Sequence, residues 1–363
     1  MLAALSRADL CAARAALRAQ LEALPADARI AVCAHTRPDG DAIGSVAALS
    51  GALRAAGHQV TSLLADNAAV PQAYRWMPQA ADFVSAHRLD KTTVFDLFIA
   101  LDTPELARLG EAGHFCRTAR SQVLIDHHPV RIPYSQLMLA VTDAAAVGQL
   151  VWELLPDLGL TRDAEIATAC YVALVSDTGS FAFSNTNEDA LADAAAMVAA
   201  GARPDVIAYE VFGRKPLAAL KLDELILSRI TLENEGAVVT SWYGHEDLER
   251  LGVSADWTES LVDLIRVVDG TQVAVLLVNG AQGGRVSLRS GGGFDVSAVA
   301  TRFGGGGHHA AAGITWPDAA ATCDDILATL LPLLPVGSAT LAGEALGSTL
   351  PADSLPDSTE APV

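Results

Sequence analysis

The amino-acid sequence predicts an α/β protein, with a mainly parallel sheet in a first domain and a smaller α/β domain after it. Short runs of Val, Ile and Leu alternate with segments whose apolar residues recur at helical spacing, a pattern typical of strands buried between helices. At 363 residues the chain also exceeds the usual size of one hydrophobic core. We therefore expect a first domain over residues 1–200, a helical linker over 201–230, a second domain over 231–335 and a disordered tail over 336–363.

The first domain is predicted to begin with a helix, which Pro25 ends, and then to alternate between strands and helices. The predicted strands are 30–34, 60–64, 97–101 and 123–125, and the predicted helices are 9–24, 42–56, 148–155, 164–175 and 188–200. Beyond residue 201 the sequence is more charged and favours helix through the linker. In the second domain we predict strands at 237–242, 273–278 and 285–289, and helices at 259–268, 296–302 and 324–333.

Composition narrows the classes of partner. The formal charge of −19 argues against a protein that coats long nucleic acid, because such binding needs a broad basic face. The five cysteines are scattered and form no Cys-x-x-Cys pair, which fits a reduced compartment. The N-terminal segment is too charged for a signal peptide, and no apolar run approaches the ~18 residues of a membrane span. We expect a cytoplasmic protein that binds neither long nucleic acid nor a membrane.

Side chains that bind metals follow four apolar segments of the first domain. His35, Asp39 and Asp41 follow the strand at 30–34, Asp102 follows 97–101, Asp126, His127 and His128 follow 123–125, and Asp177 ends the apolar segment at 164–175. Each motif alone is as readily a turn, a helix cap or a buried histidine. Together they are expected to meet at strand ends along one edge of the sheet, where ligands of α/β proteins gather.

The ligand types indicate the chemistry. Many carboxylates with few imidazoles and no thiolates suit Mn²⁺ or Mg²⁺ better than a structural zinc. The set offers more ligands than one ion needs, so we predict two cations roughly 3.5–4 Å apart. Such a pair activates water and stabilises the attacking and leaving oxygens at phosphorus. Phosphoester hydrolysis is therefore the predicted reaction class.

The second domain contains a segment that predicts an anion site. Arg285, Arg289 and Ser290 precede four consecutive glycines at 304–307, which are followed by His308. Consecutive glycines let backbone amides approach an anion, and an arginine fork binds phosphate with two hydrogen bonds. A flexible turn is the alternative interpretation of the glycines. The segment is not a P-loop, because no Gly-Lys-Ser/Thr follows.

With these motifs, residues 25–335 resemble the DHH phosphoesterase superfamily, specifically members with a DHH-associated domain 1 such as the NrnA-type oligoribonucleases/pAp phosphatases and related cyclic-dinucleotide phosphodiesterases. The resemblance implies an active site in a cleft between the domains, with one cation held by His35, Asp39 and Asp102. It implies a second cation held by Asp41, Asp102, His127 and Asp177, so that Asp102 is the bridge. By the same resemblance His128 contacts the substrate phosphate and Asp126 orients the site.

In the second domain the resemblance implies substrate contacts. These are Arg289, Ser290, the backbone of Gly305, Gly306 and Gly307, and His308, with Arg285 a weaker candidate. Residues 143–149 depart from the family, in which hydroxyl residues and a Glu are frequent at this helix start. The metal ligands that the resemblance implies are all present in this sequence. The substrate contacts that relatives make at this helix are not expected here, because the residues differ.

The implied function is Mn²⁺-dependent hydrolysis of short nucleotides, namely short oligoribonucleotides (nanoRNA) or pAp, with Mg²⁺ as the alternative cation. Turnover of cyclic di-AMP or pApA is the alternative activity. A nucleotide sensor without activity is the non-enzymatic alternative, disfavoured because every expected ligand is present. A zinc peptidase lacks its His-Glu-x-x-His helix. The resemblance also admits a homodimer.

Overall fold

The computed structural model describes residues 7–67, 69–254, 257–258, 261–279, 284–291, 293–316 and 321–337. The chain divides into two compact units, Met1–Lys215 and Pro216–Val363, and each is described by itself. Apart from residues 336 and 337, the tail expected at 336–363 lies outside the described residues. Among the helices described, none combines the length and the apolar composition that a membrane span requires.

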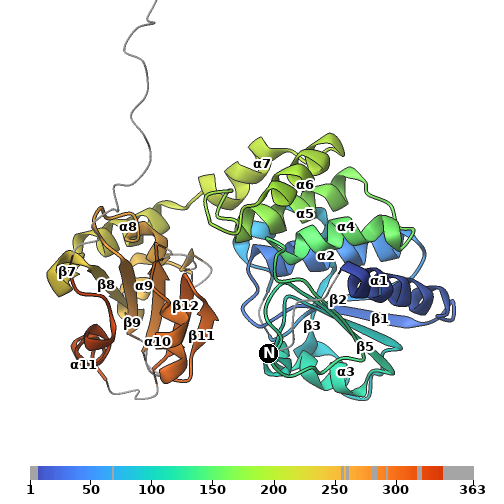
Figure 1. Cartoon of the computed structure of the whole chain (residues 1–363), viewed down its shortest axis with the longest axis horizontal. Helices are drawn as coiled ribbons and strands as arrows, with labels where there is room; N and C mark the ends of the chain where they lie inside the picture. The colour runs from blue at the N-terminus through green and yellow to red at the C-terminus, as the bar shows by residue number, and fades with distance from the viewer. Residues whose placement is uncertain are drawn as a thin grey trace, which may run out of the picture. The chain divides into compact units, whose positions relative to one another are not determined.

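The first unit is built on a six-stranded parallel sheet of order β3-β2-β1-β4-β5-β6 (Figure 1). Its strands are β1 (Arg29–Cys33), β2 (Gln59–Leu64), β3 (Phe83–Ser85), β4 (Leu97–Leu101), β5 (Ser121–Asp126) and β6 (Leu137–Ala140). The strand order reverses between the neighbours β1 and β4, which makes their carboxyl ends the expected place for a ligand. The four predicted strands are present, whereas the short edge strands β3 and β6 were not predicted.

Helices cover both faces of this sheet. The helices of the unit are α1 (Arg7–Glu22), α2 (Gly40–Ala55), α3 (Ala112–Thr118), α4 (Val147–Asp157), α5 (Ala164–Asp177), α6 (Glu188–Ala199) and α7 (Pro204–Ala208). Alternate strand residues point to opposite faces, so Ile30 and Val32 join the core under α1, α2, α4 and α5, while Ala31 and Cys33 join the core under α3. The sheet is therefore buried on both sides, as its continuous apolar strands require.

The second unit has a mixed sheet of order β11-β12-β10-β9-β8-β7, in which only β8 and β9 among the described pairs are parallel. Its strands are β7 (Thr231–Glu233), β8 (Val238–Gly244), β9 (Val273–Asn279), β10 (Arg285–Ser290), β11 (Gly306–His308) and β12 (Ala311–Thr315), and its helices are α8 (Leu217–Ser228), α9 (His245–Leu251), α10 (Val296–Arg302) and α11 (Cys323–Leu330). The helix predicted at 259–268 is wrong. Within its described part, a 3-10 turn at Leu261–Leu264 replaces it, since the β-branched residues Val262 and Ile265 weaken helix formation.

Close packing of α2 against α5 sets the position of α2. A Cβ at Gly44 would lie 2.4 Å from the Ala169 carbonyl oxygen and 2.9 Å from the Ala173 nitrogen. We expect Gly44→Ala to lower the free energy of unfolding by about 1–3 kcal/mol, because backbone atoms cannot yield easily. A Cβ at Gly51, on the same helix, would only touch Ile166 at 3.9 Å. Gly51→Ala should therefore be neutral or stabilising by up to about 1 kcal/mol. Urea denaturation of both variants checks this, and equal effects would contradict it.

Candidate metal centre

The predicted ligands of the first unit meet at the carboxyl edge of its sheet. All but one of them lie at or just after the ends of β1, β4 and β5, as expected for ligands of a parallel sheet. Asp126 ends β5, Asp41 lies in the first turn of α2 after the β1 loop, and the others lie in the loops. The exception is Asp177, which is the last residue of helix α5 and does not follow a strand. Its assignment to a strand end is wrong, because the apolar segment before it is a helix buried on nearly all sides. The structure nevertheless brings Asp177 to the same place.

One group of donors consists of His35, Asp39 and Asp102. His35 Nε2 lies 3.3 Å from Asp102 Oδ2 and 3.7 Å from Asp39 Oδ2. The other ring nitrogen, Nδ1, lies 2.9 Å from the carbonyl oxygen of Thr36, which can only accept and so orients the ring. Asp39 caps α2 by accepting the amide of Ala42 on Oδ1, so that Oδ2 faces His35. Each side chain is thus held with one donor atom toward the others.

A second group consists of Asp41, His127 and Asp177. His127 Nε2 lies 3.9 Å from Asp41 Oδ2 and 3.7 Å from Asp177 Oδ2. It also lies 3.7 Å from Asp102 Oδ1. Asp102 therefore turns one oxygen toward each group, which is the geometry that a bridging carboxylate needs. Asp102 also has a left-handed backbone, with φ of 51°, a conformation that costs energy and occurs preferentially at functional sites.

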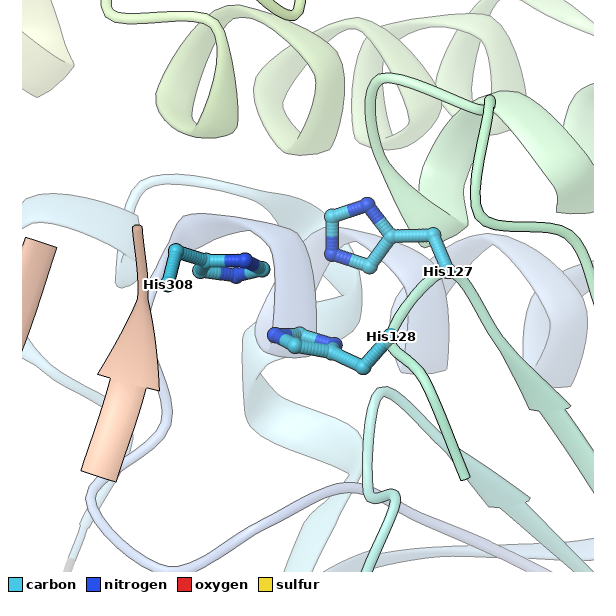
Figure 2. A group of neighbouring side chains, drawn as sticks. All are labelled: His127, His128 and His308. Carbon is cyan, nitrogen blue, oxygen red and sulfur yellow. The ribbon is translucent and has the colours of Figure 1, made fainter. Parts of the chain in front are cut away.

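His128 lies beside both groups, close to Asp102 and to His127. Figure 2 shows it next to His127, on the loop after β5. Its Nδ1 is 2.9 Å from Asp126 Oδ1 and 3.2 Å from Asp102 Oδ1. Asp126 is fully buried and its Oδ1 also accepts the His128 amide at 2.8 Å. The rings of His127 and His128 meet edge to face at 4.4 Å. Asp126 thus fixes the orientation of the His128 ring.

The protonation of these side chains reflects crowded negative charge. Burial, together with the neighbouring charges of Asp39 and Asp102, raises the pKa of Asp177 to about 8. Burial and nearby Asp102 likewise raise the pKa of Asp41 well above its usual range. Burial disfavours a charged His128, but hydrogen bonds to Asp102 and Asp126 outweigh it and raise the pKa of His128 to about 10. These carboxylates repel one another and cannot all be ionised together, so a bound cation would stabilise their charged forms.

The donor set fits divalent cations. The distances of 3.7–3.9 Å from His127 Nε2 to the surrounding carboxylate oxygens are too long for hydrogen bonds. They are short enough for all of these atoms to reach one ion, and each group of donors lies within 4.8 Å. Carboxylates with one imidazole per group are ligands for Mn²⁺ or Mg²⁺. The residues present therefore fit a metal site of the kind the sequence predicts.

Without a bound cation, the stability of the protein is expected to fall as the pH rises from about 6 to 9. Asp177 keeps its proton in the folded state up to a pKa of about 8, whereas the unfolded chain releases it near 3.8. Burial lowers the pKa of His35 and of His128, but their carboxylate partners outweigh it and raise both values to about 10. The stability that these two charged imidazoles contribute therefore declines between pH 6.5, where the unfolded chain releases the protons, and pH 10. All three contributions decline as the pH rises. Thermal unfolding in EDTA across this range checks the sign, and added Mn²⁺ should flatten the dependence.

In the second unit, strand register places Arg289 and His308 on one face of the sheet. Arg289 on β10 pairs with Ala311 on β12, and Ala311 pairs with His308 on the edge strand β11. Residues paired across a sheet point to the same side, so the small Ala311 lies between the two polar side chains. Arg289 Nε also lies 3.4 Å from Asp263 Oδ1, which holds the guanidinium in place.

Two other predicted contacts of this unit have structural roles. Ser290 is buried and its hydroxyl donates to the Phe294 carbonyl at 2.7 Å, so it does not share the exposed face of Arg289. The glycines that were predicted to form an anion nest enter strand β11, and their contact with a substrate stays a prediction. A Cβ at Gly305 or at Gly307 would lie 2.2–2.3 Å from carbonyl oxygens of β12, which explains these glycines by hairpin packing. Gly306 meets nothing within 4 Å, and Arg285 is exposed.

Two residues that orient candidate metal ligands were not predicted from the sequence. Asn185 donates to the carbonyl oxygens of Ala145 and Asp177, and Ser45 donates to Asp41 Oδ1. Ser45 lies four residues after Asp41 on α2, a spacing that places it on the same helix face. Asn185 carries no such signal, because its partners are brought to it only by the packing of α5 and the loop before α4.

Comparisons with known proteins agree with this architecture. A model described as "DHH family, N-terminal domain" matches residues 29–174, and one described as "DHHA1 domain" matches residues 236–333. The bifunctional oligoribonuclease and PAP phosphatase NrnA of Thermus thermophilus is 31% identical over 286 residues, which are 79% of this chain and 83% of that protein. The Bacillus subtilis protein of the same name is 28% identical over 303 residues, 82% of this chain and 91% of that protein.

Among solved structures, an exopolyphosphatase-related protein from Bacteroides fragilis shares the fold. It superposes with a TM-score of 0.79 at 21% identity, covering 91% of this chain and 99% of that one. The family matches confirm the resemblance inferred from the motifs. The chain belongs to the DHH family of phosphoesterases and carries both a DHH and a DHHA1 domain.

Proposed function

We propose that this protein is a divalent-cation-dependent hydrolase of short nucleotides, acting on short oligoribonucleotides and pAp with Mn²⁺ as its cation. The observation that carries the proposal is the pair of His/Asp groups that share Asp102 at the strand-order reversal. Similarity to relatives named as oligoribonuclease and PAP phosphatase supports the substrate class. The formal charge of −19 supports short rather than long nucleic acid.

Two divalent cations, when bound, would supply the Lewis acidity that activates water and offsets charge at phosphorus. The protein's own part is to hold the donors in place. The Thr36 and Ala144 carbonyls fix the two imidazoles through their Nδ1 atoms, so each Nε2 faces carboxylates. His128, charged and oriented by Asp126, stabilises negative charge that develops on the phosphate oxygens. Water-poor surroundings strengthen these interactions, because most of the donors are buried.

The second domain is proposed to bind the nucleotide through Arg289 and His308. Their side chains share one face of the sheet with Ala311 between them, which leaves room for a phosphate or base. Arg289→Ala and His308→Ala are each expected to raise KM for pAp and RNA dinucleotides by about 10–100-fold, as loss of a charge-assisted hydrogen bond implies. Steady-state kinetics and Mn²⁺ titration check this, since affinity for Mn²⁺ should not change.

Arg302→Ala is the matched control for these variants. Arg302 is an exposed arginine in the last turn of α10, and removing it deletes the same charge from the same unit. Its KM should stay at the wild-type value. An equal rise in KM for Arg302→Ala would mean that general charge, and not the Arg289 face, governs binding.

The test of the proposed function is a side-by-side assay in Mn²⁺. The substrates are an RNA dinucleotide, pAp, pApA and cyclic di-AMP, and the readout is kcat/KM for each. Higher values for RNA dinucleotide and pAp support the proposal. Preference for cyclic di-AMP or pApA would instead assign second-messenger turnover, and tight binding of all four without turnover would indicate a nucleotide sensor.

A further inference from the structure

The carboxylate of Asp41 is held by one short turn, residues 144–148, whose last two residues begin α4. The amides of Val147 and Gly148 donate to Asp41 Oδ2 and Oδ1 at 2.7 and 2.9 Å. Ser45 also donates to Oδ1, at 2.9 Å. Each carboxylate oxygen accepts about two hydrogen bonds, so Oδ1 is saturated while Oδ2 keeps one lone pair. That lone pair belongs to the oxygen 3.9 Å from His127 Nε2.

The same turn orients the other two donors of the second group. The Ala144 carbonyl lies 3.2 Å from His127 Nδ1, which assigns the proton to Nδ1 and leaves Nε2 as the ligand nitrogen. The Ala145 carbonyl accepts from the Asn185 amide at 3.0 Å. That amide also donates to the Asp177 carbonyl at 3.1 Å. The turn therefore holds Asp41 and His127 directly. It reaches Asp177 through Asn185, whose amide also lies 3.5 Å from Asp177 Oδ2.

The turn is itself locked by the side chain of Gln149. Its Oε1 accepts the Ala145 amide at 2.9 Å, and its Nε2 donates to Asp193 Oδ2 at 3.0 Å. The side-chain amide accepts through its oxygen and donates through its nitrogen, as these two hydrogen bonds require. A Glu at this position has no proton to donate when ionised and would face the Asp193 carboxylate. Gln149 is 2% exposed, so water cannot replace either partner.

We propose that Gln149 and Asn185 are positioning residues that act through the 144–148 turn to set the affinity of the second cation group alone. The first group is held by other parts of the chain, because its orienting contacts come from Thr36 and the amide of Ala42. Disturbing the turn should therefore lower the affinity for one ion and leave the affinity for the other unchanged. This inference rests on the proposed function, since it requires that the two groups bind cations.

The experiment measures Mn²⁺ binding to the full-length, metal-stripped protein by isothermal titration calorimetry, with thermal melts to confirm folding. The variants are Gln149→Glu and Asn185→Ala, the latter at a half-exposed side chain where folding is less at risk. Gln79→Glu is the matched control. Gln79 is also buried and also donates to a carboxylate, Glu165, but it contacts neither group. The identical chemical change is thereby made away from the turn.

The wild type should bind two ions, and Gln149→Glu and Asn185→Ala should each weaken one of them by about 10–100-fold, as loss of ligand-orienting contacts does elsewhere. The other ion should keep its wild-type affinity, and Gln79→Glu should keep both. The inference would be overturned if both variants bound both ions with wild-type affinity, or if they bound both ions equally more weakly. If Gln149→Glu does not melt cooperatively, Asn185→Ala decides. A wild-type protein that binds no Mn²⁺ would refute the proposed function instead.

Discussion

Replacing Asp102 with Asn is expected to reduce kcat for phosphoester hydrolysis by at least about a thousand-fold. The two oxygens of Asp102 face different donor groups, with Oδ2 at 3.3 Å from His35 Nε2 and Oδ1 at 3.7 Å from His127 Nε2. An amide offers a neutral oxygen to one side and an N–H donor to the other, so one cation would lose its shared ligand outright. Steady-state turnover of pAp in saturating Mn²⁺ measures the effect.

Asn is the informative replacement because it preserves the backbone. Asp102 has φ of 51°, and Asn tolerates this left-handed conformation far better than Ala does. A loss of activity in a protein with an unchanged melting profile then reports on chemistry. Asp27→Asn, at an exposed position, is the matched control and should retain wild-type turnover. A folded Asp102→Asn variant with kcat within about tenfold of wild type would contradict the shared-ligand geometry.

Removal of divalent cations is the second change with a large expected effect. Dialysis against EDTA should abolish turnover, because no group of the chain replaces the Lewis acidity by which bound cations activate water. Mn²⁺ should restore activity better than Mg²⁺, since each group includes an imidazole, which suits Mn²⁺ more than the harder Mg²⁺. Activity before chelation, after it and after reloading is the measurement. Undiminished turnover in the chelated protein would rule out the cation requirement.

The central strands of the first sheet could be predicted from the sequence, whereas its edge strands could not. Buried strands such as β4 are continuous apolar runs flanked by turns, which have few alternative structures. Edge strands such as β3, with three residues, depend on a neighbour for their hydrogen bonds and leave little trace in composition. In the second unit, close hairpin contacts explain Gly305 and Gly307, and the role of these glycines in anion binding stays a prediction.

The clustering of the candidate metal ligands was predictable because strand ends converge on one edge of a parallel sheet. Asp177 was named for the wrong reason, since it ends a helix. The residues that orient the ligands were not predictable. Asn185 and Gln149 act through backbone atoms of Ala145, and only tertiary packing shows which backbone atoms lie within reach. A sequence pattern therefore identifies candidate metal ligands more readily than it identifies the residues that orient those ligands.

Anomalous diffraction from crystals grown with Mn²⁺ would show directly whether two cations bind at Asp102. We expect two anomalous peaks at the carboxyl edge of the first sheet, roughly 3.5–4 Å apart, with Asp102 touching both. The remaining contacts should be His35 and Asp39 on one peak, and Asp41, His127 and Asp177 on the other. No peak at this edge, or a single peak that leaves either group without an ion, would contradict the two-cation centre.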